Sequence, residues 1–350
     1  MVVALIISLN FHPGHVSHLV ASYRQLEELG YKSVFCVNEA FVPYLPKGTN
    51  ISVYGKDKLD KISIALFVFP SQKNLSLIHR LKREGTKIVY IFHEPLSPLK
   101  DYRKAGFSYL YLIKLWIINQ ISSLTVKWSD AVILPSLKAL EFYKANPLYT
   151  NPNIYYLPLM YDDEREKVHV EAERKYFGYI GTIAADHSFQ EYLQFVEWAI
   201  SNNALTDLDF LVVTKSQFEV PDSLKGNPRL FVQAGRPLSD DEINNFYAQT
   251  AVVWNAYERT TQSGVLAKSF MFGTPALILK RNSNEFTEDG VEVRAINDNT
   301  DCNEIMNAVE CIRKDISNYS ENSRKRFLSS FYYRNYNESF ANILEEINYK

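Results

Sequence analysis

The sequence has little cysteine and no strong excess of charge of either sign. Its three cysteines, Cys36, Cys302 and Cys311, form no Cys-x-x-Cys pair, which excludes a disulfide framework and a zinc site and favours a reducing compartment. The formal net charge is -2 at pH 7, and a general nucleic-acid-binding protein would carry a basic excess. We therefore expect a cytoplasmic protein with no nucleic-acid partner.

Long apolar runs and low-complexity tracts are also absent from the sequence. No run reaches the roughly 18–20 apolar residues of a membrane span. The first residues, MVVALIISLNFHPG, lack a basic start and a cleavage site of small residues. They predict a first strand rather than a signal peptide.

Aromatic residues, in contrast, are abundant, with 23 tyrosines and 21 phenylalanines. They cluster in FSYLYLIKLWIINQI, residues 107–121, a run that Lys114, Asn119 and Gln120 interrupt. One interpretation is a buried helix that covers a sheet. The other is a peripheral membrane contact through residues 100–128, with basic side chains facing lipid phosphates, namely Lys100, Arg103, Lys104 and Lys114.

Apolar runs and helical patterns alternate along the whole chain, which predicts an α/β fold with parallel sheets covered on both faces. A polar interval at 161–174 divides the pattern into two Rossmann-like domains, 1–160 and 175–332. We expect the last helix, 333–350, to cross back to the N-terminal domain. Two such domains make the cleft that they face the default ligand site.

The segment SGVLAKSFMFGTPALIL, residues 263–279, predicts a helix followed by a buried strand. Gly273 suits the left-handed turn that ends a helix, and Pro275 prevents its continuation. A helix that opens on Ser263 and Gly264 points its first N–H groups forward, where they can bind an anion. The alternative is an ordinary α/β repeat with a normal cap.

Other candidates follow the strands, because active residues of such sheets lie at the carboxyl ends of the strands. His93 and Glu94 end a strongly apolar strand, where folding alone does not require them. Gly14 sits in a tight turn after the first strand, and His15 can donate a hydrogen bond there. His18, one turn further, is better suited to a structural role.

The order of these segments resembles the GT-B glycosyltransferases, specifically those of the glycosyltransferase family 4 type. The resemblance is carried by YFGYIGTIAADHSFQEYLQFVEWA, by RLFVQAGRPLSDDEINNFYAQTAVVWNAYE and by residues 263–279, and more weakly by PGHVSHLVASYRQLEELGY, IFHEP and SDAVILPS. It implies that a nucleotide-sugar donor binds the C-terminal half and the acceptor the N-terminal half. It also implies that His93 contacts the donor sugar. His93 or Glu94 can accept the acceptor's proton.

The sequence departs from the family pattern at four charged positions. Two glutamates of the family correspond to Thr260 and Lys268, with Glu258 two residues early for the first of them. An arginine and a lysine that bind the diphosphate correspond to Thr182 and His187. A histidine beside a diphosphate would gain charge.

We therefore predict a donor site in which other groups replace the missing charges. The replacement cations are Lys215, Arg236 and Lys268, and the remaining donor-binding candidates are Gly14, Gly181, Thr182, His187, Glu258, Thr260, Thr261, Gln262, Ser263, Gly264 and Val265. The predicted catalytic residues are His93, Glu94 and His15. No pair of aspartates stands where a metal-dependent transferase would need it, so we expect neither metal nor cofactor.

The predicted function is sugar transfer to a glycan or a lipid-linked oligosaccharide, in surface polysaccharide biosynthesis at the inner face of the membrane. The anomeric outcome stays open. Two alternatives also stay open: a nucleotide-sugar epimerase of the same fold, and a non-catalytic binding subunit.

Overall fold

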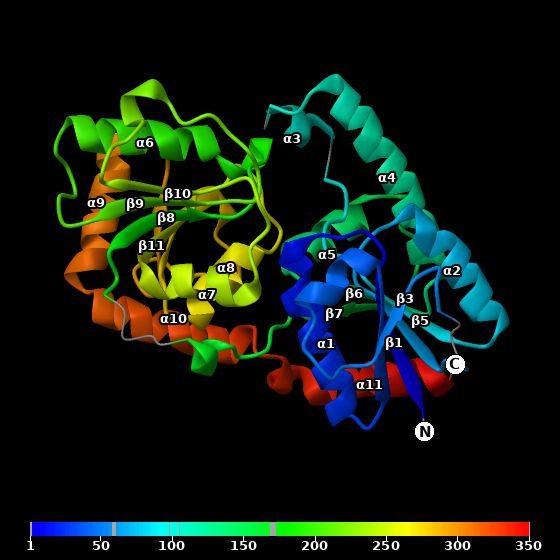
Figure 1. Cartoon of the computed structure of the whole chain (residues 1–350). Coiled ribbons are helices and arrows are strands. Elements are labelled where there is room, and N and C mark those ends of the chain that lie inside the picture. The colour runs from blue at the N-terminus through cyan, green and yellow to red at the C-terminus, as the bar shows by residue number, and fades with distance from the viewer. Residues whose placement is uncertain (1, 58–60, 98, 105, 169–172, 350) are drawn as a thin grey trace. The chain divides into compact units, whose positions relative to one another are not determined.

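The computed structural model describes residues 2–57, 61–97, 99–104, 106–168 and 173–349. The chain forms two compact units (Figure 1), with Met1–Asp162 and Phe331–Lys350 in unit 1 and Asp163–Ser330 in unit 2. The predicted boundaries at 160 and 332 fall close to these. Residues 169–172 of the predicted linker lie outside the described residues.

Unit 1 is a parallel sheet with the strand order β3-β2-β1-β4-β5-β6-β7 among the described residues. Its strands are β1 (Val3–Ser8), β2 (Lys32–Val37), β3 (Ile51–Val53), β4 (Ile64–Phe67), β5 (Lys87–Ile91), β6 (Ala131–Leu134) and β7 (Ile154–Tyr156). Its helices are α1 (Val16–Glu28), α2 (Gln72–Arg83), α3 (Leu99–Lys104), α4 (Tyr109–Trp128), α5 (Leu137–Ala145) and α11 (Asn337–Tyr349).

Unit 2 repeats this plan with the order β10-β9-β8-β11-β12-β13. Its strands are β8 (Tyr176–Ile180), β9 (Asp209–Val213), β10 (Leu230–Gln233), β11 (Thr250–Asn255), β12 (Ala276–Leu279) and β13 (Val293–Ile296). Its helices are α6 (Phe189–Ser201), α7 (Asp240–Gln249), α8 (Gly264–Met271), α9 (Cys302–Lys314) and α10 (Ile316–Ser330). Both sheets are parallel throughout their described pairings, which confirms the α/β prediction.

Local sequence signals place the element ends where the pattern predicts them. Ser71 and Ser136 cap α2 and α5 by accepting hydrogen bonds from Lys73 N and Ala139 N. Gly273 follows α8 with φ +68°, and a Cβ there would lie 2.9 Å from Ser320 O, so only glycine fits this turn.

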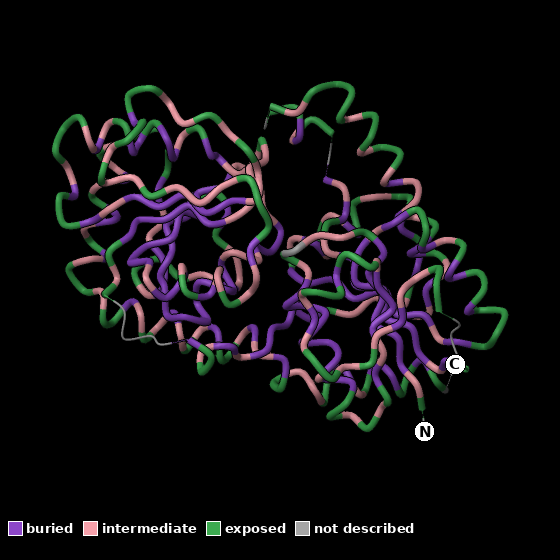
Figure 2. Tube along the Cα trace, viewed as in Figure 1, coloured by how far each residue is buried: buried purple, intermediate pink, exposed green. Residues whose placement is uncertain are grey.

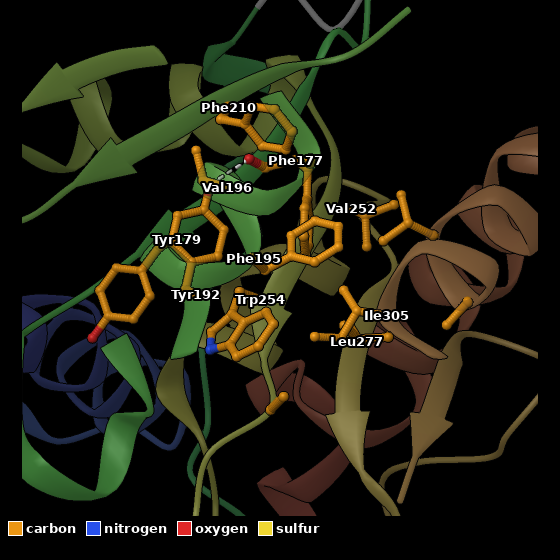
Figure 3. Packing of buried hydrophobic residues seen from close by; sticks show 14 of the residues in the cluster. Phe177, Tyr179, Tyr192, Phe195, Val196, Phe210, Val252, Trp254, Leu277 and Ile305 are labelled. Carbon is orange, nitrogen blue, oxygen red and sulfur yellow. Dashed lines mark hydrogen bonds between the residues drawn. The ribbon is translucent and has the colours of Figure 1, made fainter. Parts of the chain in front are cut away.

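The core of unit 2 is unusually aromatic (Figure 3), with Phe177, Tyr192, Phe195 and Trp254 packed edge to face or tilted against one another. Tyr192 brings a hydroxyl into this core, where an unpaired polar group would cost free energy. Its Oη donates to Phe177 O at 2.7 Å and accepts from Leu211 N at 3.3 Å. The hydroxyl therefore joins β8 to β9 from within the core.

The end of the chain packs on unit 1, as the predicted crossing helix requires. Tyr161 N donates to Phe331 O at 2.9 Å, and Tyr333 Oη donates to Glu28 at 2.6 Å. Gln25, fully buried on α1, donates to Asn337 at 3.2 Å.

The predicted linker is more ordered than its polar composition suggests. Asp162 pairs with Arg24 within unit 1, while Asp163 pairs with Arg324 within unit 2. Consecutive carboxylates are thus held by different units, and the free stretch of the linker is shorter than predicted.

Candidate functional site

Each sheet contains one point where the strand order reverses, between β1 and β4 in unit 1 and between β8 and β11 in unit 2. Loops that leave the carboxyl ends of two such strands diverge to opposite faces of the sheet. The crevice between them is where ligands bind in open parallel sheets. Most of the sequence-predicted residues lie near these two places, and Arg236 and Lys268 are exceptions.

In unit 2, the loop after β11 leads into the N-terminus of α8. Ser263 is the N-cap of α8, and its Oγ accepts from Leu266 N at 3.3 Å. Buried Asn255, the last residue of β11, donates to the same Oγ at 2.8 Å. The hydroxyl of Ser263 is thus occupied by the cap, and Gly264 and Val265, both half-buried, hold the first two amides of the helix.

The end of β8 lies directly against this helix terminus. Gly181 has φ +154°, and a Cβ there would lie 3.4 Å from Val265 Cγ2 and 3.6 Å from Tyr257 Oη. A side chain at position 181 would be strained and would enter the space before α8. The structure therefore brings Gly181, Thr182 and the start of α8 together.

His187 closes the same loop after β8. Its Nδ1 donates to Thr182 O at 2.6 Å, and its ring stacks on Tyr257 with a centroid separation of 4.4 Å. The hydrogen bond orients the imidazole and leaves Nε2 as the second ring nitrogen, 3.9 Å from Asp186. Tyr257 was not predicted; its position at the end of a buried strand is the signal that marks it.

Glu258 belongs to this group of loops, although it is two residues early in the family pattern. Its backbone N donates to Asp186 O at 2.8 Å, beside His187. Its carboxylate pairs with Arg281 and accepts from buried Asn299 at 3.0 Å. Asn299, which sequence reasoning missed, also donates to Ser188 Oγ at 2.9 Å, so it ties the loops after β8 and β11 together.

Lys215 follows β9, the neighbour of β8, and is half-buried. Burial lowers the pKa of its ammonium, and among the described residues no carboxylate lies within ion-pair distance. The adjacent Ser216 Oγ accepts from Ile183 N at 3.3 Å, which joins the Lys215 loop to the Gly181–Thr182 loop. An anion at the end of β8 would compensate this charge.

Arg236 is placed differently, in the loop between β10 and α7. It is exposed and pairs with Glu242 at 2.6 Å, where Glu242 also completes a capping box with Ser239. Its role at the donor stays a prediction.

Lys268 does not supply a cation to the helix terminus. It is buried, with Nζ 2.6 Å from Glu164 and 3.5 Å from Asp240, and it donates to Asn244 at 3.0 Å. Burial alone would lower the pKa of Lys268, but the two carboxylates raise it. Because its charge is already neutralised, the assignment of Lys268 to the donor site is corrected to a structural one.

The three side chains that precede Ser263 in the sequence differ in how exposed they are. Thr261 and Gln262 are buried, with 1% and 9% of their surfaces exposed, whereas Thr260 is half-buried. Thr260 therefore has the better access to a ligand of the three.

In unit 1, histidines gather around Phe69 beyond the ends of β1, β4 and β5. His15 and His93 both lie against the Phe69 ring, His93 with a centroid separation of 4.3 Å. His12 stacks on His15 at 4.6 Å. Phe69 and His12 were not singled out by sequence, and Gly14 lies beside His12, whose ring a Cβ at position 14 would approach to 3.3 Å. Gly14 thus belongs to unit 1, whereas the other donor-binding candidates belong to unit 2.

His18 is the buried member of this group and is structural, as its position predicts. Its Nδ1 donates to Met160 O at 3.2 Å, and its Nε2 accepts from Tyr161 Oη at 3.2 Å. This ring lies 5.4 Å from His93.

His93 is held in its neutral form. Burial, with a smaller effect from His18, lowers the pKa of its imidazole well below 6.5. A neutral imidazole at the end of β5 can accept a proton, whereas a charged one cannot. Glu94, the next residue, is exposed.

Among the described residues, no group of three histidine, cysteine, aspartate or glutamate side chains is arranged to hold a metal ion.

No protein-family model matches the sequence, and a comparison with curated proteins finds no match. Solved structures do match. The chain is similar to HepE of Anabaena, solved in complex with UDP and glucose, with a TM-score of 0.69 at 13% identity over 99% of this chain and 100% of that one. It is similar to a glycosyltransferase from Rickettsia africae, with a TM-score of 0.70 at 10% identity over 99% and 98% of the two chains.

A third similar structure is a UDP-N-acetylglucosamine 2-epimerase from Listeria monocytogenes, so described provisionally, with a TM-score of 0.61 at 11% identity over 97% of this chain and 94% of that one. At these identities the likeness concerns the fold. The chain has the α/β fold of GT-B proteins, built from two Rossmann-like units.

Proposed function

We propose that the protein is a glycosyltransferase that moves a sugar from a nucleotide-sugar donor to a glycan or lipid-linked oligosaccharide. The observation that carries the proposal is the arrangement at the reversal point of unit 2. There the N-terminus of α8 meets Gly181, and the loop of the uncompensated Lys215 joins the same edge. Amide dipoles and an ammonium suit a diphosphate.

In the proposed reaction, the bond between the sugar C1 and the diphosphate oxygen breaks, and the acceptor oxygen forms the new bond to C1. The acceptor proton passes to His93 or Glu94, and the nucleoside diphosphate leaves with the electron pair of the broken bond. Burial lowers the pKa of His93, which keeps its imidazole neutral but also makes it a weaker base than an exposed histidine. HepE, of similar fold, was solved with UDP and glucose, which supports UDP-glucose as the first donor to test.

We place the protein in the cytoplasm, and its proposed process is the synthesis of a surface polysaccharide. The three cysteines are free thiols, which agrees with a reducing compartment.

Binding and turnover test the proposal in sequence. Isothermal titration of the full chain with UDP, GDP and ADP should show binding of one of them, with a matching rise in melting temperature. Incubation of the corresponding nucleotide sugar with oligosaccharide acceptors should then yield a longer glycan, and the NMR coupling of its anomeric proton reports the stereochemistry. Failure of all three nucleotides to bind would refute the proposed function.

A second candidate function is epimerisation of a nucleotide sugar, which the similarity to the Listeria structure supports. An epimerase changes UDP-N-acetylglucosamine in the absence of any acceptor, whereas a transferase needs one for product to appear. NMR of the nucleotide sugar with enzyme alone therefore separates the two.

A further inference from the structure

Helix α4 has its apolar and polar faces reversed relative to a helix of an ordinary soluble protein. Its buried residues are Asn119, Ser122, Thr125 and Val126. Six of its seven exposed apolar residues form a stripe along the opposite face, which we call the α4 outer stripe: Tyr109, Leu110, Ile113, Trp116, Ile117 and Leu124. Their separations of three, four and seven residues keep them on one side of the helix.

The inner face is satisfied by polar contacts with the rest of unit 1. Asn119 Oδ1 accepts from Tyr149 Oη and from Asn146, and Asn151 donates to Val126 O at 2.8 Å. These contacts join α4 to the segment after α5 and fix which face points outward, and α4 also lies beside α2 (Figure 1). The expectation of a buried helix is therefore wrong for the stripe.

The exposure of the stripe is large and concentrated. Leu110 is 80% exposed, Ile113 57% and Trp116 53%. Of the large apolar residues that are exposed in the described part of the chain, seven of fifteen lie on α4. Figure 2 shows the corresponding run of exposed and half-exposed positions along this helix. Single exposed apolar residues are ordinary, but a contiguous group indicates a binding surface.

The charged residues of segment 102–129, which Asp101 and Asp130 flank, are all cations. Residues 102–129 contain no aspartate or glutamate. They contain the exposed cations Arg103, Lys104, Lys114 and Lys127. Arg103 lies 5.0 Å from the centre of the Tyr109 ring, and Lys114 lies 5.7 Å from that of Tyr111. Cations thus stand beside aromatic rings at the edge of an apolar surface.

This combination matches the interface of an anionic bilayer. Apolar side chains enter the acyl boundary, aromatic rings lie at the level of the headgroups, and cations pair with lipid phosphates. A second copy of the chain fits less well, because pairing two stripes would bring the same cations together.

None of the helices in the described part of the chain combines the length and the apolar character needed to span a bilayer.

We propose that the α4 outer stripe docks on a lipid surface that carries anionic headgroups, with α4 lying in the plane of the interface. The inference does not depend on the proposed function, since it rests on the surface of unit 1 alone.

Co-sedimentation of the full chain with vesicles tests this. Vesicles of phosphatidylcholine with phosphatidylglycerol should bind the chain at least about tenfold more strongly than vesicles of phosphatidylcholine alone, and salt should weaken binding. The fluorescence of exposed Trp116 should shift to the blue on binding.

Two double variants separate the contributions. Ile113→Asn with Trp116→Asn should lower the vesicle partition coefficient at least about tenfold, because both side chains lose their apolar burial. Arg103→Ser with Lys104→Ser should lower it about thirtyfold on anionic vesicles and leave it unchanged on neutral ones. The control, Leu148→Asn with Phe231→Asn, removes exposed apolar residues elsewhere and should bind as the parent does.

Three results would overturn the inference. They are equal binding by the stripe variant, no binding by the parent chain, and a dimer in light scattering that the stripe variant converts to monomer. Melting temperatures confirm that each variant is folded. Nucleotide titration of the same samples is independent, so either proposal can fail while the other stands.

Discussion

The two units share a backbone plan and differ in the side chains that line its reversal point. In unit 2 the point is lined by glycine, by a helix N-terminus and by the loop of a half-buried lysine. In unit 1 the equivalent point is lined by imidazoles packed around Phe69. Geometry alone therefore supplies a crevice, and the residues decide whether it suits an anion or a proton transfer.

The two units also differ in the charge state of the side chains at their crevices. Unit 2 keeps the charge of Lys215 uncompensated at its crevice but neutralises that of Lys268, a residue of α8. Burial raises the pKa of Glu164, but Lys268, Asn244 and Lys167 together lower it to about 2, so the carboxylate stays charged. Unit 1 instead holds His93 uncharged by burial. The crevice of unit 2 suits an anion, whereas the crevice of unit 1 holds an imidazole in its neutral form.

The sharpest test of this contrast removes the imidazole of unit 1. His93→Ala should reduce turnover about 10²–10⁴-fold, the usual contribution of a general base, and leave the Kd of the nucleotide unchanged. Steady-state kinetics and calorimetry measure the two effects separately. His79→Ala, an exposed histidine on α2, is the matched control. If Glu94→Gln loses turnover and His93→Ala does not, the base has been assigned to the wrong residue.

A negative charge added at the crevice of unit 2 should affect nucleotide binding, whereas His93→Ala affects turnover. Gly264→Asp should weaken nucleoside diphosphate binding about a hundredfold, since a carboxylate would face the diphosphate at the helix terminus. An aspartate in the first turn does not destabilise a helix, so the melting temperature should hold. Gly264→Ala keeps the amide, adds no charge and serves as control. An unchanged affinity of the aspartate variant for the nucleoside diphosphate would show that α8 is not part of the binding site.

Two candidate donor-binding cations of unit 2, Lys215 and Arg236, can be compared by their effect on nucleotide affinity. Lys215→Ala should weaken nucleotide binding about tenfold, the scale of one hydrogen bond to a charged group. Arg236→Ala should change it less, because Arg236 already pairs with Glu242 in solvent. Calorimetry on both variants gives the ranking, and the reverse order would move the diphosphate toward β10.

The smallest effect concerns stability and pH. The folded state resists protonation of His93, whereas the unfolded chain takes up a proton below its ordinary pKa near 6.5. The free energy of unfolding should therefore fall as the pH drops below about 6.5, by up to about 1.4 kcal/mol per pH unit, and be unaffected above it. Urea titrations between pH 5 and about 7.5 measure this slope. His93→Phe should flatten it and His79→Gln should not.

Most strands could be predicted because they are short apolar runs bounded by glycine, proline or a capping serine. Strand β13, Val293–Ile296, is harder to predict, since it is a run of only four residues that contains Arg294. Helix α9 was not singled out, although Asp301 caps it through Asn303 N and Glu304 N.

The candidate site was predictable in position and less so in chemistry. Strand ends led to His93 and Gly181, and the start of a helix led to Ser263; their roles in binding and catalysis stay predictions. The neutralisation of Lys268 depends on Glu164, which is 104 residues away in the sequence. No local pattern reports such a contact, and the same holds for the packing of Phe69 between His15 and His93.

The return of residues 331–350 to unit 1 has a consequence for synthesis. Unit 2 is continuous in sequence, so a ribosome completes it before the last segment of unit 1 has emerged, in which Phe331 O accepts from Tyr161 N and Tyr333 Oη donates to Glu28. Unit 1 is therefore the first unit to be translated and the last to be completed. Until residues 331–350 emerge, Gln25 lacks its hydrogen-bond partner Asn337.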